Sequence, residues 1–240
     1  MALILVTGAA GGLGYDTASA LAGDGHDVVV HVRHRARLGD AGHDAGRWAG
    51  VVTGDLAHLD EIHGVAAQAA AFGRFDAVVH NAGVLHSPDT ATVNTVAPYV
   101  LTALMERPGR LVYVSSSMHH GGSTDLGRLA AGTASYADSK LWVTTLALAV
   151  AARWAGTASH AVDPGWVPTR MGGPGAPDDL AAGHRTQVWL ATGSGITPPT
   201  GGYWYHRRTQ APHPATRDED FRARLLQTLA EHTGVPLASG

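Results

Sequence analysis

A tyrosine and a lysine stand four residues apart in the segment Tyr136-Ala137-Asp138-Ser139-Lys140. Two side chains at this spacing share one face of a helix. An ammonium group about 4 Å from a phenol would lower the phenol pKa by roughly 3 units, from about 10 toward neutrality. Such a phenol can protonate a carbonyl oxygen or accept a proton from an alcohol. The pair predicts acid–base chemistry at Tyr136, although the same spacing also occurs in exposed pairs that have no function.

The lysine usage of the chain favours the functional interpretation of this pair. Of the 17 basic residues, 16 are arginine, and Lys140 is the single lysine. A planar guanidinium does not replace a compact ammonium at a tight site. We therefore expect Lys140 to occupy a position that rejects arginine.

A second set of residues indicates a dinucleotide site. The apolar run Leu3–Val6 leads directly into the glycine-rich turn Thr7–Gly14, and a helical stretch follows. Glycine allows a tight turn and a close approach of the backbone to a pyrophosphate, and a helix N-terminus offers free N–H groups to the phosphates. A glycine-rich turn indicates dinucleotide binding only when it follows a strand and precedes a helix, as it does here. The expected cofactor contacts here are Gly8, Gly12, Leu13 and Gly14.

The end of the second apolar run bears on the choice of cofactor. After Val28–Val32 the chain continues with Arg33-His34-Arg35-Ala36-Arg37, and no carboxylate stands at this point. An acidic residue here would bind the ribose 2′-hydroxyl of NAD, whereas arginine suits the 2′-phosphate of NADP. We expect NADP(H) as the cofactor, with Arg33 as the main contact, and NAD as the less favoured alternative. The competing interpretation is an ordinary solvated arginine loop.

These motifs, in this order, resemble those of the short-chain dehydrogenase/reductase family over about Leu3 to Thr169. The resemblance implies a nicotinamide cofactor and further residues that contact it. Asp55 matches the family aspartate beside the adenine ring, and Asn81-Ala82-Gly83 matches a turn that lies against the cofactor. Pro164 to Thr169 matches the segment that meets the nicotinamide carboxamide. The implied contacts are Asp55, Leu56, Asn81, Ala82, Gly83, Tyr136, Lys140, Pro164, Gly165, Val167 and Thr169.

The resemblance also implies a catalytic tetrad of Asn94, Ser116, Tyr136 and Lys140. Tyr136 would exchange the proton, Ser116 would bind the substrate oxygen, and Asn94 would hold a relay water. Lys140 would lower the tyrosine pKa and bind the nicotinamide ribose. Three serines stand in a row at 115–117, and alignment on the preceding strand favours Ser116 over Ser115.

The spacing from Ser116 to Tyr136 is longer than the commonest spacing in the family. The Met118-His119-His120 segment that follows the serines resembles retinol-dehydrogenase-like members. This resemblance implies a small-molecule carbonyl or alcohol substrate that is bulky and apolar. Trp166, Met171, Trp189, Trp204 and Tyr205 are candidates for the substrate pocket, although core packing explains the last three equally well.

Positioning these residues requires strands and helices in alternation. Short apolar runs predict buried strands, and the longer stretches rich in alanine and leucine between them predict helices. This order predicts an α/β fold with a doubly wound, Rossmann-type parallel sheet covered by helices on both faces. No linker is evident, so we expect a single domain over 1–240. The expected strands are Leu3–Val6, Asp27–Val32, Gly50–Val52, Phe75–His80, Arg110–Ser115 and Thr157–Val162, and the expected helices are Leu13–Ala22, Leu59–Ala71, Thr90–Glu106, Tyr136–Trp154 and Arg217–His232.

One segment departs from this alternation. Gly165 to Asp179 contains three prolines and four glycines in fifteen residues, so it predicts an irregular and flexible loop beside the expected nicotinamide site. We expect this loop, at about 165–179, to close over cofactor and substrate.

The composition of the chain bears on its partners, on metal binding and on its location. The net charge is −3 with no basic cluster, which argues against nucleic-acid and anionic-membrane partners. Cysteine is absent, and the fifteen histidines form no recognised metal-ligand pattern, so no metal site is expected. No signal or spanning segment is evident, which favours a cytoplasmic protein. A homo-oligomer is left open.

The motifs favour an NADP(H)-dependent oxidoreductase that interconverts a carbonyl and an alcohol. Two alternatives share the fold. A non-catalytic dinucleotide-binding regulator would not need serine, tyrosine, lysine and asparagine together. A sugar-nucleotide epimerase or dehydratase would carry a larger C-terminal substrate domain than the roughly 70 residues that follow Thr169.

Overall fold

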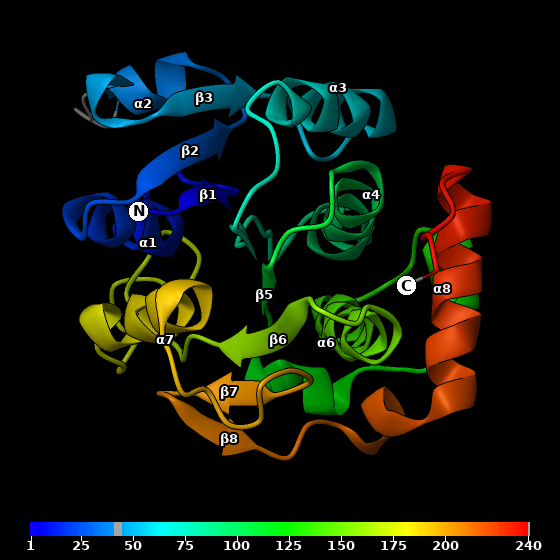
Figure 1. Cartoon of the computed structure of the whole chain (residues 1–240). Helices are drawn as coiled ribbons and strands as arrows, with labels where there is room; N and C mark the ends of the chain where they lie inside the picture. Colours follow the sequence, from blue (N-terminus) through cyan, green and yellow to red (C-terminus); the bar gives the residue numbers. More distant parts are fainter. Residues whose placement is uncertain (41–44, 240) are drawn as a thin grey trace.

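A computed structural model describes residues 1–40 and 45–239 (Figure 1). All strands of this part of the chain form one sheet in the order β3-β2-β1-β4-β5-β6-β7-β8. Neighbouring strands are parallel except for β8, which runs antiparallel to β7. The strands are β1 (Leu3–Val6), β2 (Asp27–Val32), β3 (Gly50–Thr53), β4 (Ala77–His80), β5 (Arg110–Val114), β6 (Ala158–Asp163), β7 (Tyr203–Tyr205) and β8 (Arg208–Gln210).

Helices cover both faces of the sheet (Figure 1). Strand side chains alternate between two hydrophobic clusters, so that Leu5 of β1 faces one cluster while Ile4 and Val6 face the other. This two-sided burial explains why the strands are apolar throughout. One face carries α1 (Gly12–Gly23), α2 (Ala36–Asp40) and α7 (Leu180–Thr192), and the other carries α3 (Leu59–Ala70), α4 (Ala97–Leu104), α6 (Tyr136–Arg153) and α8 (Glu219–Thr233).

The doubly wound α/β fold predicted from the sequence is confirmed, and each of the six expected strands is present within two residues of its expected bounds. The sequence analysis missed β7, β8 and α7. The two missed strands have three residues each, which is too short for an alternation pattern to register. Trp204, a candidate for the substrate pocket, lies in β7 and packs in the core against Trp189, with ring centres 5.0 Å apart.

The helix expected over Thr90–Glu106 is two elements. A π-helical turn, η2 (Thr92–Val96), precedes α4. Pro98 explains the change, because proline has no N–H and cannot donate to the carbonyl of Asn94, four residues earlier. The regular α-helical ladder is therefore interrupted at Asn94, one of the predicted catalytic residues.

Two segments complete the fold around the site. Residues 164–179 form no helix or strand, and they are closed into a loop by hydrogen bonds between Trp166 and Asp178. The expected flexibility of this loop stays a prediction. At the other end, the C-terminal tail is fixed to the helical face, because Tyr99 donates to the carbonyl of Val235 and the Trp154 indole donates to that of Ala238. No helix in the described part of the chain has the length and apolar content needed to cross a bilayer.

Candidate active site

A pocket of about 1060 Å³ opens at the carboxyl ends of the parallel strands. It includes the point between β1 and β4 where the strand order reverses, which is the position where ligands bind in open α/β sheets. Its lining contains every predicted catalytic and cofactor-binding residue except Asn94. Of the candidates for the substrate pocket, Trp166 and Met171 line it, whereas Trp189, Trp204 and Tyr205 do not. The predicted residues in the lining are Gly8, Gly12, Leu13, Gly14, Arg33, Asp55, Leu56, Asn81, Ala82, Gly83, Ser116, Tyr136, Lys140, Pro164, Gly165, Val167 and Thr169.

The glycine-rich turn is built tightly against the turn that follows β4. A Cβ atom on Gly8, whose φ is +69°, would lie 2.7 Å from Cα of Ala82. A Cβ on Gly14 would lie 2.5 Å from the carbonyl oxygen of Gly8. Two side chains brace this arrangement: Thr7 Oγ1 accepts hydrogen bonds from the N–H groups of Asn81 and Ala82, and Asn81 Nδ2 donates to the Thr7 carbonyl. Neither glycine can therefore carry a side chain.

The N-terminus of α1 faces the same pocket. Its N-cap residue, Gly11, has no side chain to bond the first N–H groups of the helix. Uncapped N–H groups and the helix dipole together attract a phosphate. The tight glycine turn and the uncapped helix thus fit the pyrophosphate of a dinucleotide.

His31 was missed by the sequence analysis, although it lies in the pocket lining. Its ring is buried at the second-last position of β2, where Nδ1 accepts from the Gly8 N–H at 3.2 Å and Nε2 donates to the Gly54 carbonyl at 2.9 Å. Burial lowers the pKa of His31, so the ring is neutral. The His31 ring thus connects the glycine-rich turn, through Gly8, with Gly54, the first residue after β3. The available signal was a polar residue inside an otherwise apolar strand.

The residues after β2 form a positively charged edge of the pocket. Arg33 and Arg37 both line it, and the Arg33 side chain is half exposed. Arg33 Nε lies 3.3 Å from Asp55 Oδ2, so the two predicted cofactor contacts pair with each other. The guanidinium retains its two terminal nitrogens for another partner.

The three serines occupy different environments. Ser115 is buried, and its hydroxyl shares a 2.6 Å hydrogen bond with Thr144 beneath the pocket. Ser116 is half-buried, its hydroxyl accepts from the Met118 N–H at 3.2 Å, and its side chain acts to lower the pKa of Tyr136. Ser117 is exposed. Among the three, Ser116 is the serine whose side chain affects the pKa of Tyr136.

The pKa lowering expected for Tyr136 is wrong for this structure. Burial raises the pKa of Tyr136 to about 12, the Ser116 hydrogen bond acts in the opposite direction, and the charge of Asp163 adds to the increase. Lys140 does not offset this, because its Nζ lies 5.4 Å from the ring centre and donates to the Val114 carbonyl at 2.8 Å. Desolvation therefore outweighs the ammonium charge, and Tyr136 is a protonated acid at neutral pH.

Lys140 itself is buried, and burial lowers its pKa to about 8 while the Asp163 carboxylate partly counteracts this. Asp163, at the end of β6, was also missed. Its Oδ1 accepts from the Gly165 N–H and its Oδ2 accepts from the Tyr203 hydroxyl. An acidic residue at the carboxyl end of a parallel strand, directly before Pro164, was the signal in the sequence.

Asn94 lies behind the pocket lining. Its side-chain oxygen accepts from the Val84 N–H at 2.8 Å, and its amide nitrogen donates to the Val84 carbonyl and to the Ser139 hydroxyl. Both amide hydrogens are used in these bonds. The side chain therefore fixes the Val84 loop and α6. The main-chain carbonyl of Asn94, in contrast, has no α-helical N–H donor, because the residue four positions later is Pro98.

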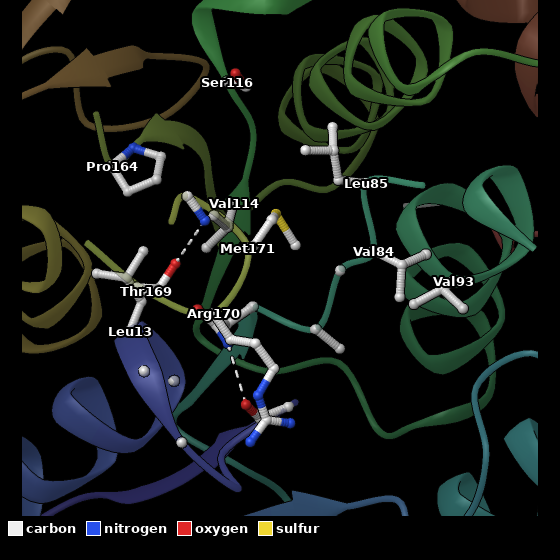
Figure 2. A pocket seen from close by; sticks show the side chains of 18 of the residues that line it. Leu13, Val84, Leu85, Val93, Val114, Ser116, Pro164, Thr169, Arg170 and Met171 are labelled. Carbon is white, nitrogen blue, oxygen red and sulfur yellow. Dashed lines mark hydrogen bonds between the residues drawn. The ribbon is translucent and has the colours of Figure 1, made fainter. Parts of the chain in front are cut away.

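The rest of the pocket is apolar. Figure 2 shows Val84, Leu85 and Val93 grouped on one side, with Met171 across from them. Met118, Trp166 and Met171 are 53%, 60% and 43% exposed, and they are three of the six exposed large apolar side chains in the described residues. Exposed apolar side chains gathered at one pocket mark a binding surface.

A model of the short chain dehydrogenase family matches residues 2–179. The chain belongs to this family. It is an oxidoreductase that depends on a nicotinamide dinucleotide, as the sequence resemblance implied. The short-chain dehydrogenase chyC of Penicillium rubens is 36% identical over 256 residues, which cover 99% of each chain.

More distant similarities agree with this membership. Human retinol dehydrogenase 13 is 27% identical over 285 residues, covering 98% of this chain and 86% of the human one. The crystal structure of a Shigella flexneri short chain dehydrogenase complexed with NADP is 25% identical with a TM-score of 0.69. It covers 86% of this short-chain dehydrogenase and 97% of the Shigella chain.

Proposed function

We propose that this short-chain dehydrogenase uses NADP(H) to interconvert a bulky apolar ketone or aldehyde and the corresponding alcohol. When bound, the cofactor supplies or accepts a hydride. Tyr136 donates the proton to the carbonyl oxygen, and the Ser116 hydroxyl bonds the same oxygen. The observation that carries the proposal is that Ser116, Tyr136 and Lys140 line the same pocket as the glycine-rich turn.

The other two residues of the tetrad support Tyr136. Lys140 is held by the Val114 carbonyl beneath the tyrosine ring, where its ammonium faces the pocket lining and can bond the ribose of the cofactor. A guanidinium is too large for this buried position. We assign the relay water to the main-chain carbonyl of Asn94, because the side chain of Asn94 is occupied.

The preference for NADP(H) is supported by the arginines after β2. Arg33 and Arg37 line the pocket, and the nearest carboxylate, Asp55, pairs with Arg33 and so orients it. A phosphate dianion can accept charge-assisted hydrogen bonds from the free nitrogens of Arg33. The NADP complex of the similar Shigella chain agrees with this preference. The cytoplasmic location and the assembly state remain predictions.

The substrate class follows from the apolar half of the pocket. Val84, Leu85, Val93, Met118 and Met171 line the same pocket as Ser116 and Tyr136. Methionine side chains are flexible and polarisable, so they adapt to large apolar groups of different shapes. An uncharged substrate with an aromatic or polycyclic body beside its carbonyl fits this surface.

Binding and turnover test the proposal directly. NADPH and NADH are titrated against the wild-type protein, Arg33→Asp and the matched control Arg35→Asp, whose arginine lies outside the pocket lining. Loss of charge-assisted hydrogen bonds of about 1.5–3 kcal/mol should weaken NADPH binding roughly 10- to 100-fold in Arg33→Asp. NADH binding and the Arg35→Asp control should change little. Equal wild-type affinities for the two cofactors would contradict the preference for NADP(H).

Turnover is measured with a panel of bulky ketones, small ketones and the corresponding alcohols. We expect activity with NADPH and a preference for the bulky ketones. Cofactor binding without turnover of any carbonyl or alcohol would favour the alternative of a non-catalytic regulator.

A further inference from the structure

His119 is completely buried although its neighbours Met118 and His120 are exposed. It lies in η3 (Ser117–Gly121), the short turn that begins directly after Ser116. A histidine ring removed from water is tolerated when both of its nitrogens are hydrogen-bonded. The contacts of these two nitrogens define what His119 does.

The contacts allow only one form of the ring. His119 Nδ1 lies 2.7 Å from the carbonyl oxygen of Ser116, which can only accept, so Nδ1 carries the hydrogen. His119 Nε2 lies 3.0 Å from the N–H of His213, which can only donate, so Nε2 presents a lone pair. The imidazole is therefore neutral and in a single tautomer. The ring of Tyr203 lies 4.6 Å away and restricts its tilt.

The first of these bonds acts on the catalytic serine. Ser116 has an extended backbone, with φ −165° and ψ 152°, and its peptide carbonyl bonds His119 while the residue lines the same pocket as Tyr136. Fixing the carbonyl restricts ψ of Ser116 and thus the path along which the chain enters η3. The hydroxyl also accepts from the Met118 N–H, which depends on the same turn.

The second bond connects this turn to a distant part of the chain. His213 precedes η4 (Pro214–Arg217), and its own carbonyl accepts from both the N–H and the hydroxyl of Thr216. The segment 203–217 lies beyond residue 179, where the match to the family model ends. This segment touches the Ser116 turn through His119, and Tyr203 in the same segment donates to Asp163 of the pocket lining.

We propose that His119 is a positioning residue, which couples the segment 203–217 to the Ser116 carbonyl and thereby directs the Ser116 hydroxyl toward Tyr136. The inference rests on the proposed function. It assigns to the C-terminal segment a part in catalysis that does not involve contact with substrate or cofactor.

Two variants of His119 separate its two bonds. The amide nitrogen of Asn lies where Nδ1 lies in histidine, so His119→Asn can still donate to Ser116 but does not reach His213. The longer Gln places its amide near the Nε2 position, so His119→Gln can accept from His213 but loses the Ser116 bond. We expect kcat for ketone reduction to fall about tenfold or more in His119→Gln and to stay closer to wild type in His119→Asn, because small misplacements of catalytic groups are costly. The ketone KM and the NADPH dissociation constant should change little in both.

The exposed His120 provides a control for the two bonds: its ring lies 4.0 Å from that of His119, so His120→Asn removes a ring contact but neither hydrogen bond. A double mutant tests whether His119 acts through Ser116: the His119→Gln effect should largely disappear in a Ser116→Ala background. Equal losses of kcat in the Asn and Gln variants, no loss in either, or a full additional loss in the Ser116→Ala background would each overturn the role of His119.

The link to the C-terminal segment is tested at His213 without altering the core. His213→Ala keeps the N–H that donates to His119, whereas His213→Pro removes it, and the native φ of −51° suits proline. We expect a lower kcat in His213→Pro than in His213→Ala at similar melting temperatures. Equal kcat values would overturn the coupling to this segment. A wild-type protein that turns over no carbonyl or alcohol would overturn the proposed function as well, which distinguishes the two failures.

Discussion

Ser115 and Ser116 are adjacent in the sequence, yet their hydroxyls point into different environments. The Ser115 hydroxyl bonds Thr144 beneath the pocket, whereas the Ser116 hydroxyl accepts from the Met118 N–H at the pocket lining. Successive side chains of an extended segment point to opposite sides, which is why one hydroxyl enters the core and the other enters the pocket. Single substitutions at the two serines can therefore distinguish an effect on stability from an effect on catalysis.

The serine pair gives the first prediction. Ser116→Ala should reduce kcat by roughly 10²-fold, since it removes the hydrogen bond that we propose to the reacting oxygen. Ser115→Ala should leave turnover near the wild-type value and lower the free energy of unfolding by about 1 kcal/mol through the lost Thr144 bond. Steady-state kinetics and thermal denaturation of both variants provide the measurement. A larger kinetic effect at Ser115 would contradict the assignment.

The second prediction concerns the proton on Tyr136. With a pKa of about 12, Tyr136 is almost fully protonated at pH 7, and only about one molecule in 10⁵ carries the phenolate. Alcohol oxidation requires the phenolate as base, so its rate should rise nearly tenfold per pH unit between pH 7 and 9. Carbonyl reduction requires the protonated form and should not rise over this range. Tyr136→Phe should lower both rates by roughly 10²- to 10⁴-fold and leave NADPH binding intact.

At the scale of elements, the irregular start of the α4 region matters most for the site. The π-helical turn Thr92–Val96 contains Asn94, and Pro98 withholds the N–H that would otherwise bond the Asn94 carbonyl. π-helical turns frequently occur at functional sites, because they free backbone groups from the regular ladder. The proline thus connects a local break in the helix with the proposed site of the relay water.

Pro98→Ala tests this connection and is the third prediction. Alanine restores the N–H, which can then bond the Asn94 carbonyl and compete with the relay water. We expect kcat to fall several-fold at unchanged NADPH affinity, while the melting temperature stays the same or rises because alanine is the better helix former. Leu104→Ala at an exposed position of the same helix, away from Asn94, serves as the control for general effects on α4. An unchanged kcat in Pro98→Ala would contradict a role for this carbonyl.

At the scale of the whole molecule, buried histidines are spread through the structure. His31 holds the glycine-rich turn, His80 bonds Thr102, His119 holds the Ser116 turn and His160 bonds the Gly202 N–H and the Trp204 indole. Burial lowers the pKa of all four, to about 3 for His80 and about 4 for His119 and His160. The folded protein therefore keeps these rings neutral where the unfolded chain would protonate them.

This difference sets the sign of the fourth prediction. In the unfolded chain each histidine binds a proton below its ordinary pKa of about 6.5, so the unfolded state gains protons as the pH falls while the folded state does not. Each ring can then cost up to about 1.4 kcal/mol of stability per pH unit between 6.5 and its folded pKa. The melting temperature should be nearly constant from pH 8 to 7 and fall steeply from pH 6 to 4.5. His160→Gln should reduce the slope, and a flat profile down to pH 5 would contradict the prediction.

The sequence alone was sufficient for the family, the parallel sheet and most of the pocket lining. Apolar runs that alternate with helical stretches leave few chain topologies, and the glycine turn, the Asn81-Ala82-Gly83 turn and the Tyr136–Lys140 pair each depend on local spacing. The spacing of residues along the chain can be read from the sequence without knowledge of the fold. The choice of Ser116 as the catalytic serine stays a prediction, because Ser115, Ser116 and Ser117 all line the pocket.

Other properties depend on groups that meet only after folding. The pKa of Tyr136 is set by burial and by Asp163, which is 27 positions away in the sequence, so the pair of Tyr136 and Lys140 alone predicted the wrong direction. His119 and His213 are separated by 94 positions, and no local pattern relates them. Desolvation and long-range hydrogen bonds are properties of the packed structure, because they depend on which side chains exclude water from a group and not on its neighbours along the chain.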